Sequence, residues 1–335
     1  MKVFLTGGTG FIGSHVANVL HSRGHEIVAL ARPTSDTAHL ESLGATIARG
    51  DVTDPASLEA AAAGCDIVIH AAAVVGPVGK WEHFEAVGVQ GTANVIRAAQ
   101  SAGIRRFIHV GSIAVYGSRP GGRTYSESTP FDYTPEGWNH YVREKVRSEQ
   151  ALWEAHGYQR IAATSMRPSI VIGPGDRNFL PRAIDVVNFR FARITGSGNN
   201  YIAFVVVEEV ADAIVRAAER EETAGQAYNL SGTPRITQRQ LFNTMTDLLG
   251  KPPITGTMSF NMAMRSAGLL EAWWRLARRP GEPPVTRFGV ALVGQQFQVD
   301  TTRAREQLGW EGNASYEDAL RRSLEWHRAN VTSAV

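Results

Sequence analysis

The sequence predicts an α/β fold, in which a doubly wound parallel sheet is followed by a smaller, mixed C-terminal domain. In the first half of the chain, short apolar runs alternate with segments of helical periodicity, and Gly, Pro or Asp stands at most connections. After Pro168 this alternation loosens, and Pro and Gly pairs interrupt the chain from Lys251 onward. We therefore expect residues 1–172 to form the first domain, with strands from about 203–231 returning to it, and residues 173–335 to form mainly the second.

The predicted strands are short apolar runs, as the buried strands of a parallel sheet require. They are expected at Lys2–Thr6, Glu26–Ala31, Thr46–Arg49, Ile67–His70, Phe107–Gly111 and Ala162–Arg167, with further strands at Val205–Val207 and Tyr228–Leu230. The segments between them have helical periodicity. Helices are expected near Gly10–Arg23, Thr37–Leu43, Pro55–Ala63, Phe84–Ala102 and Trp138–His156, and a further amphipathic segment begins near Pro181.

The composition excludes several classes of protein. Lys and Arg (34) nearly balance Asp and Glu (32), so there is no electrostatic case for a nucleic-acid partner. The single cysteine, Cys65, excludes an internal disulfide framework and a cysteine metal cluster, and we expect no metal site. No apolar stretch approaches the ~20 residues of an integral membrane segment. Because the first strand begins at Lys2, a targeting peptide has no room, and we expect a cytoplasmic protein.

A glycine-rich loop, TGGTGFIG, follows the first predicted strand and opens a helix. Gly7 permits a tight turn, Gly10 lets the backbone approach a pyrophosphate, and Gly13 allows close packing of helix and sheet. The helix start at Phe11 and Ile12 offers unpaired N–H groups and a positive dipole end to the phosphates. This loop therefore predicts that the first domain is a Rossmann-type dinucleotide-binding domain.

The end of the second predicted strand indicates which dinucleotide binds. An NAD site usually has an Asp or Glu there to bind the ribose 2′-hydroxyl, but this chain has Ala31 followed by Arg32. A guanidinium suits a 2′-phosphate, and no carboxylate is present to repel one. We expect NADP(H) to be preferred, whereas NAD(H) is also accepted if Arg32 is only a solvated loop residue.

Other residues that follow strands are expected to border the cofactor. Asp51 and Val52 come after the third strand and are placed to meet the adenine edge. Small residues follow the fourth strand, where the cofactor passes close to the backbone; they are Ala71, Ala72 and Ala73. His70 stands just before them, and a histidine at the end of a buried strand is more often structural than a catalytic base.

A Tyr and a Lys four residues apart predict the chemistry. Tyr141 and Lys145 share one face of a predicted helix. A positive charge beside a phenol favours the phenolate, so this pair can transfer a proton near neutral pH. Ser112 stands about 30 residues upstream at the end of an apolar run. Together with the glycine loop, these residues predict a nicotinamide-dependent enzyme.

An ordered set of motifs extends this interpretation along the chain. It comprises TGGTGFIG, GDVTD at 50–54, HAAA at 70–73, GSIAVYG at 111–117, YVREK at 141–145, MRP at 166–168, VEEVADA at 207–213 and LGW at 308–310. The set resembles the extended short-chain dehydrogenase/reductase superfamily, also called the epimerase/dehydratase family. The resemblance implies that Ser112 hydrogen-bonds the substrate oxygen and that Tyr141 exchanges a proton with it. It also implies that Lys145 binds the nicotinamide ribose and favours the phenolate, with Pro168 bordering the cofactor.

Within the superfamily, residues 166–182 are similar to the 3β-hydroxysteroid dehydrogenase branch, with dihydroflavonol reductases as near relatives. The resemblance implies an NADP-preferring oxidoreductase that interconverts a secondary alcohol and a ketone on a hydrophobic, cyclic small molecule. Ile113 and Ala114 replace the acidic pair of the dehydratases, and Ser169 follows MRP where epimerases commonly have an Asn. A sugar-nucleotide epimerase remains the alternative enzyme, and a cofactor-binding regulatory or scaffold protein the alternative class. The family's usual Asn-Val-x-Gly-Thr begins here with Gly88, which cannot supply the amide.

The substrate side is less well determined by the sequence. Tyr116, Tyr133 and Trp138 are candidates to line the substrate pocket, because they lie on or beside the long connection between the serine and the tyrosine helix. Residues 260–279 form an apolar segment with a basic end, which we interpret as a plain packing helix, a substrate lid or a membrane-contacting helix. By analogy with the superfamily, a homodimer would form through the helices near 84–102 and 138–156.

Overall fold

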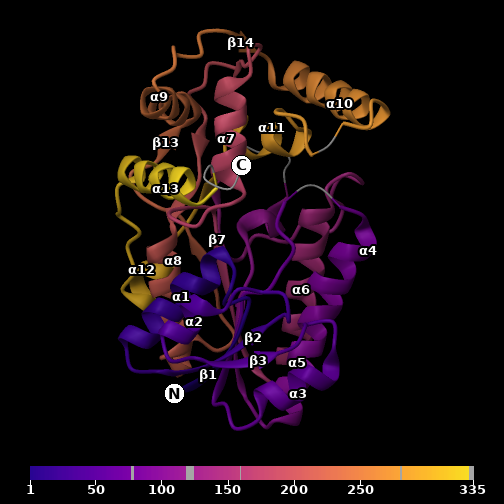
Figure 1. Ribbon diagram of the computed structural model, residues 1–335, viewed down its shortest axis with the longest axis vertical. Coiled ribbons are helices and arrows are strands. Elements are labelled where there is room, and N and C mark those ends of the chain that lie inside the picture. Colours follow the sequence, from indigo (N-terminus) through magenta and orange to yellow (C-terminus); the bar gives the residue numbers. More distant parts are fainter. Residues whose placement is uncertain (77–78, 118–123, 159, 280, 332–335) are drawn as a thin grey trace.

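The computed structural model describes residues 1–76, 79–117, 124–158, 160–279 and 281–331, and the chain folds into two lobes (Figure 1). The first lobe contains β1 (Lys2–Thr6), α1 (Phe11–Ser22), β2 (Glu26–Ala31), α2 (Ala38–Ser42), β3 (Thr46–Arg49), α3 (Pro55–Ala62), β4 (Ile67–His70), α4 (Trp81–Phe84), η1 (Glu85–Gln90), α5 (Gly91–Ser101), β5 (Arg106–Val110), η2 (Ile113–Tyr116), β6 (Thr124–Tyr125), α6 (His140–Gly157) and β7 (Ala162–Pro168).

The remaining elements build the second lobe and return to the first. They are β8 (Ile170–Ile172), α7 (Phe179–Asn188), β9 (Ile194–Thr195), β10 (Tyr201–Ile202), β11 (Phe204–Val206), α8 (Val207–Ala218), η3 (Glu221–Thr223), β12 (Ala227–Leu230), β13 (Ile236–Thr237), α9 (Gln238–Leu249), β14 (Thr257–Met258), α10 (Phe260–Leu276), α11 (Arg287–Val293), β15 (Gln298–Val299), α12 (Thr302–Leu308) and α13 (Tyr316–Asn330). None of the described helices has both the length and the apolar character needed to cross a bilayer.

The first lobe is a Rossmann-type fold around a seven-stranded parallel sheet. Its strand order is β12-β7-β5-β4-β1-β2-β3, so the order reverses between β4 and β1. Thr6 at the end of β1 is paired with Leu30 on one side and His70 on the other, and His70 is paired with His109. The carboxyl ends of the central strands therefore lie at one edge of the sheet, where open α/β sheets bind ligands.

Apolar side chains on both faces of the sheet explain why helices cover both. On one face, Leu5 and Ile69 pack with Val16 of α1 and Ile214 of α8. On the opposite face, Phe4 and Phe107 pack with α3, α5 and α6. Burying both faces removes the apolar surface of all central strands from water, which is the main stabilising term of this lobe.

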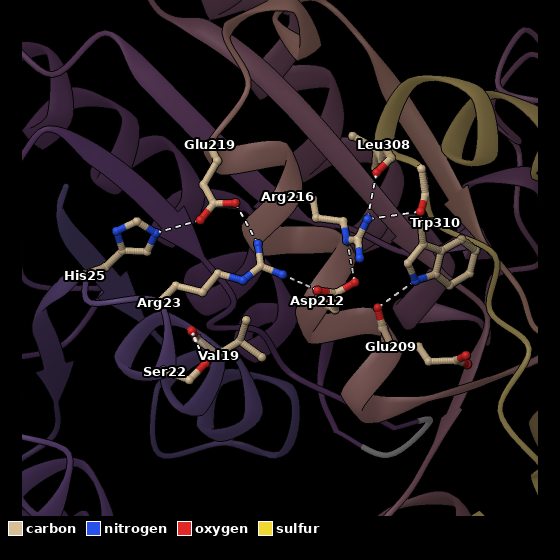
Figure 2. Close-up of polar contacts among 11 residues, drawn as sticks. Val19, Ser22, Arg23, His25, Glu209, Asp212, Arg216, Glu219, Leu308 and Trp310 are labelled. Carbon is tan, nitrogen blue, oxygen red and sulfur yellow. Dashed lines mark hydrogen bonds and ion pairs between the residues drawn. The ribbon is translucent and has the colours of Figure 1, made fainter.

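Helix α8 returns from the second lobe to the first, and polar contacts fix it there. Figure 2 shows Arg23, just after α1, between Asp212 of α8 and Glu219, which directly follows α8, and Nε2 of His25 donates to the same Glu219 at 2.9 Å. Arg216 of α8 donates to the carbonyl oxygens of Leu308 and Gly309 at 3.2 and 3.0 Å. The helix therefore joins α1 to the C-terminal segment, and β12 follows it to the edge of the main sheet.

The second lobe is built from small two-stranded pairings and helices. Its core contains Leu180 of α7, Phe204 of β11, Leu241 of α9 and Leu320 of α13. Helices α10 and α11 share a separate small cluster around Ala267 and Val290. The first lobe's short strand β6 pairs with β15, so residues before the tyrosine helix contact the C-terminal part of the chain.

The predicted strands of the first half agree with the structure to within a residue or two, but one predicted helix was wrong in detail. In place of the single helix expected over Phe84–Ala102, the structure has three consecutive elements: the short helix α4, the π-helix η1 over Glu85–Gln90, and the helix α5. The wider π-helical turn carries Gly88, against which α6 packs. Hydrophobic periodicity does not distinguish such a turn from an α-helix, since both bury the same face.

Two histidines stack behind the carboxyl edge of the sheet. His70 is buried, and its ring nitrogens lie 2.6 Å from the Thr6 hydroxyl and 3.0 Å from the Thr92 hydroxyl, which confirms its structural interpretation. His109 stacks on it with ring centroids 5.7 Å apart, and neither of its ring nitrogens has a hydrogen-bond partner among the described residues. Burial lowers the pKa of His70 to about 3 and holds the pKa of His109 well below its ordinary value.

These two histidines predict sensitivity to acid. The unfolded chain takes up their protons near pH 6.5, whereas in the folded protein His70 resists protonation until about pH 3, so the free energy of unfolding falls as pH falls through this window. We expect His109→Phe to make that slope shallower, by up to about 1.4 kcal/mol per pH unit, without loss of stability at pH 7. The slope is obtained from the free energy of urea unfolding measured at several pH values. His39→Phe, at an exposed site, is the matched control, and an equal slope in wild type and His109→Phe would contradict the prediction.

Candidate active site

A cavity of about 1140 Å³ opens at the carboxyl edge of the main sheet and extends between the two lobes. Its walls include the glycine loop, the residues that follow β2, β3, β4 and β5, and the start of the tyrosine helix α6. Every residue that the sequence predicted to bind cofactor lines this cavity: Gly7, Gly10, Phe11, Ile12, Gly13, Arg32, Asp51, Val52, Ala71, Ala72, Ala73, Lys145 and Pro168.

The glycine loop has the shape that a dinucleotide requires. A Cβ at Gly7 would lie 2.6 Å from the backbone of Ala71, and one at Gly13 would lie 2.0 Å from the carbonyl oxygen of Gly7, so packing demands both glycines. A Cβ at Gly10 would meet only the Gly7 carbonyl oxygen, at 3.1 Å. The N-cap of α1 is Gly10, which has no side chain to cap the helix, so the first N–H groups of α1 can bind a ligand. These features fit a pyrophosphate at the helix start.

The loop after β2 contributes to the wall of the cavity. Arg32 and Ser35 both line it, and no carboxylate of the described residues forms an ion pair with Arg32. Arg49 of β3 donates to the carbonyl oxygens of Arg32 and Ser35 at 3.1 and 3.2 Å and to the hydroxyl of Thr37 at 2.9 Å. Sequence reasoning missed Ser35 and Arg49, because their approach to Arg32 depends on the turn that the loop makes.

Ser112, Tyr141 and Lys145 line the same cavity. Ser112 stands two residues after the end of β5 and caps η2, and its oxygen accepts the N–H of Ala114 at 3.1 Å, which leaves the hydroxyl hydrogen available to a ligand. The ammonium of Lys145 lies 5.6 Å from the ring centroid of Tyr141. The helical spacing of four residues thus brings the amine beside the phenol ring, as the sequence predicted.

Glu144 is the buried partner of Lys145. Their charged groups lie 3.4 Å apart, and both side chains are almost fully buried. Burial alone would lower the pKa of the Lys145 ammonium, but Glu144 opposes this effect together with Tyr141, and the pKa lies above its ordinary value. Lys145 therefore stays charged beside the tyrosine at neutral pH.

The absence of a side chain at Gly88 makes room for Glu144. A Cβ at Gly88 would lie 2.3 Å from both Cγ and Oε1 of Glu144. The carboxylate therefore occupies the space beside the π-helical turn that the first side-chain atoms of the family's usual Asn would need. Sequence reasoning identified Gly88 as a departure from the family pattern, but it could not identify Glu144, which comes from a helix more than 50 residues further along the chain.

The part of the cavity that faces the second lobe combines many apolar side chains with charged ones, among them Arg177, Arg182, Asp185 and Arg193. Its lining includes Phe179, Val186, Phe189, Leu241, Phe242, Leu270, Phe288 and Phe297. Phe288 of α11 packs edge-on against the ring of Tyr141, with centroids 5.9 Å apart. Neither Phe288 nor Phe297 was predicted. Phe288 directly follows the PVTR run at 284–287, and that run does not identify it as a cavity residue.

The three aromatic residues predicted to contact substrate do not line the cavity. Tyr116 is buried, donates to Asn229 and accepts from Arg167, both at 2.7 Å, and burial raises its pKa to about 12. Tyr133 is 62% exposed, and the ring of Trp138 lies under the guanidinium of Arg287. These three residues lie close to Ser112 and Tyr141 in the sequence, but in the structure they do not lie on the wall of the cavity. Part of the connection, residues 118–123, lies outside the described residues.

The fold and this cavity define a dinucleotide-dependent enzyme with a parallel sheet. The sequence matches the NAD dependent epimerase/dehydratase family over residues 3–231, and the chain belongs to this family. It is an NAD(P)-dependent enzyme of the extended short-chain dehydrogenase/reductase type.

Curated relatives are similar along nearly the whole chain. The 2-alkyl-3-oxoalkanoate reductase of Stenotrophomonas maltophilia (strain K279a) is 30% identical over 328 residues, which cover 96% of this chain and 98% of the relative. The 4-hydroxy-2-methyl-3-oxo-4-farnesyl-3,4-dihydroquinoline-1-oxide ketoreductase of Stigmatella aurantiaca is 29% identical over 96% of both chains. The 3-beta-hydroxysteroid dehydrogenase of Mycolicibacterium neoaurum is 26% identical over 97% of this chain and 91% of its own.

A solved structure agrees with this placement. The crystal structure of gox2253 superposes with a TM-score of 0.81 at 29% sequence identity and covers 98% of both chains. Relatives that are ketoreductases and hydroxysteroid dehydrogenases support an enzyme that interconverts alcohols and ketones.

The contact of Glu144 with Gly88 predicts coupled stability effects. Gly88→Asn should overpack the site, and Glu144→Ala should leave the Lys145 charge buried without its partner, so each destabilises the fold by roughly 1–4 kcal/mol. The double variant removes the overlap, and we expect it to be more stable than the sum of the single effects predicts, by at least about 1 kcal/mol. Urea unfolding of the four proteins measures this coupling. Gly157→Asn, where an added Cβ meets nothing within 4 Å, is the control, and strict additivity would refute the contact.

Proposed function

We propose that this protein is an NADP-preferring oxidoreductase that interconverts a secondary alcohol and a ketone on a hydrophobic substrate. The observation that carries the proposal is that Ser112, Tyr141 and Lys145 line one cavity together with the glycine loop and an apolar wall. A polar corner beside an apolar wall is suited to binding one oxygen on a hydrocarbon skeleton.

In the direction of reduction, the Ser112 hydroxyl donates a hydrogen bond to the ketone oxygen, and the Tyr141 phenol gives that oxygen its proton. Lys145 stabilises the phenolate that remains, because its ammonium is held charged by Glu144. In oxidation, the phenolate takes the proton back. The dinucleotide, when bound, supplies or accepts the hydride. Phe288 packs on the tyrosine ring and helps to hold its orientation.

The substrate class follows from the lining and from the relatives. The second lobe contributes Phe, Leu and Val side chains to the cavity, and Phe288 among them packs against the ring of Tyr141, so apolar contact contributes to binding. Two relatives are named for an oxoalkanoate and for a farnesyl dihydroquinoline oxide. These names share apolar chains and a reducible oxygen rather than a ring, and we therefore propose an apolar ketone or alcohol without requiring a cyclic skeleton.

The preference for NADP(H) is supported by the loop after β2. Arg32 and Ser35 line the cavity just after the second strand, where this fold binds the ribose 2′-substituent, and the strand end has Ala31 where an NAD site has an acid. Arg49 fixes the carbonyl groups of this loop and so holds Arg32 and Ser35 in place.

The proton transfer is tested with Tyr141→Phe. The ring and its contact with Phe288 are retained, but the group that exchanges the proton is lost, so we expect turnover to fall by about 100-fold or more with NADPH binding nearly unchanged. Oxidation of NADPH, followed by its absorbance with a panel of hydrophobic ketones, measures turnover, and cofactor fluorescence titration measures binding. Turnover within a few-fold of wild type would exclude Tyr141 from the chemistry.

The same assay distinguishes an epimerase. UDP- and GDP-sugars are incubated in parallel, and the products are separated by chromatography. Two results together would overturn the proposed reaction: a sugar nucleotide changes its configuration without net change in NADPH, and no ketone causes NADPH oxidation.

The cofactor preference is tested with Arg32→Ala. We expect NADPH binding to weaken by about 2 kcal/mol, because a charge-assisted contact is lost, while NADH binding changes little. Binding of both cofactors is measured by fluorescence or calorimetry. Arg321→Ala, at an exposed arginine of α13, is the matched control. An equal loss for both cofactors would contradict a role of Arg32 at the 2′-phosphate.

A further inference from the structure

Helix α10 presents a row of large apolar side chains to solvent. Met262, Leu269, Trp273 and Leu276 are 49–84% exposed, although the helix belongs to a folded lobe. Successive members are seven, four and three residues apart, so all four lie on one side of the helix. We call these four residues the outer stripe. Figure 1 shows α10 at the outer edge of the second lobe.

The outer stripe borders the face of α10 that lines the central cavity. Ala263, Ser266, Ala267 and Leu270 line the cavity, and Ser266 and Leu270 neighbour Leu269 and Trp273 on the helix surface at spacings of three. An apolar surface therefore extends around the helix from the outside of the protein to the cavity. Ser266 is the polar residue that interrupts it.

The charges beside the outer stripe are positive. Arg265, Arg275, Arg278 and Arg279 are all exposed, and the guanidinium of Arg279 lies 5.3 Å from the ring centroid of Trp273. The acidic residue of the helix, Glu271, is engaged in an ion pair with Arg287 at 2.8 Å. The surface thus combines exposed apolar side chains with uncompensated positive charge, which is the pattern of helices that lie in the headgroup region of anionic membranes.

We propose that the outer stripe and its four arginines dock this protein on an anionic phospholipid surface. The apolar side chains enter the acyl boundary, and the arginines contact lipid phosphates. The face of α10 that lines the cavity then lies next to the membrane, and an apolar ligand reaches the cavity along the helix without crossing bulk water. The docking step is independent of the proposed function, whereas delivery of an apolar substrate rests on it.

A second copy of this chain suits the same surface poorly. In a two-fold symmetric dimer the same patch occurs on both sides, so the arginines of one copy would face those of the other. With Glu271 held by Arg287, α10 has little acidic charge to relieve that repulsion. Lipid headgroups supply the missing anions.

Docking is tested by sedimentation of the full-length protein with vesicles, in the absence of cofactor and substrate. Vesicles of phosphatidylcholine alone are compared with vesicles that contain about one-third phosphatidylglycerol, at about 0.1 M and about 0.5 M salt. We expect binding to the anionic vesicles at low salt and weak binding in the other three conditions. The double variant Leu269→Ser/Leu276→Ser should lower the partition coefficient by about tenfold or more, because it removes the most exposed apolar side chains of the stripe.

Tyr158→Ser is the matched control. Tyr158 is also an exposed aromatic residue with an arginine over its ring, Arg160, but it lies after α6 in the first lobe. The control should bind vesicles like wild type, and thermal unfolding of each variant verifies that the fold is intact.

Three results would overturn the proposal. Wild type that binds no vesicles, wild type that binds both compositions equally, and a double variant that binds like wild type each contradict docking by this surface. Sedimentation velocity distinguishes docking on a membrane from binding of a second copy of the chain. A wild-type dimer that becomes monomeric in the double variant, without vesicle binding, would assign the outer stripe to a second copy of the chain.

Discussion

The hydrogen-bond register of the parallel sheet is the constraint on which the rest of the structure depends. Because Thr6 is paired with both Leu30 and His70, the strands at the centre of the sheet end at one edge. The segments that follow these strands are the glycine loop, the Arg32 loop and the alanines after His70, and they have to meet there. A shift of one residue in any central strand would turn its core side chains to the opposite face and separate these segments.

Buried charge beneath the cavity is the second organising feature. Helix α6 carries Glu144 and Lys145 and, one turn further, Glu149, which binds Arg167 of β7 at 2.6 Å. A buried charge without a partner costs several kcal/mol, so each of these groups is fixed by the other member of its pair. The two pairs hold α6 against the sheet and against the π-helical turn at Gly88, and they set the position of the tyrosine on the same helix.

The second lobe determines what reaches that tyrosine. Phe288 of α11 packs on its ring, and Leu270 of α10 adds to the apolar wall of the cavity. The second lobe is connected to the first through α8, which packs on α1 and whose Arg216 donates to the carbonyl oxygen of Leu308 in the C-terminal segment. The same α10 lines the cavity on one face and exposes the outer stripe on another, so access to the site and contact with a surface depend on one element.

The sequence by itself determined the first lobe and the residues that follow its strands. The sequence contains local patterns, namely the apolar runs, the glycine spacing and the four-residue step from Tyr141 to Lys145. These patterns do not depend on how the second lobe packs. Only the tertiary structure decided that Glu144 fills the space at Gly88 and that Phe288, rather than Tyr116, lies beside the catalytic candidates. Which side chains from distant segments share a cavity depends on how helices pack, and spacing along one chain does not encode that arrangement.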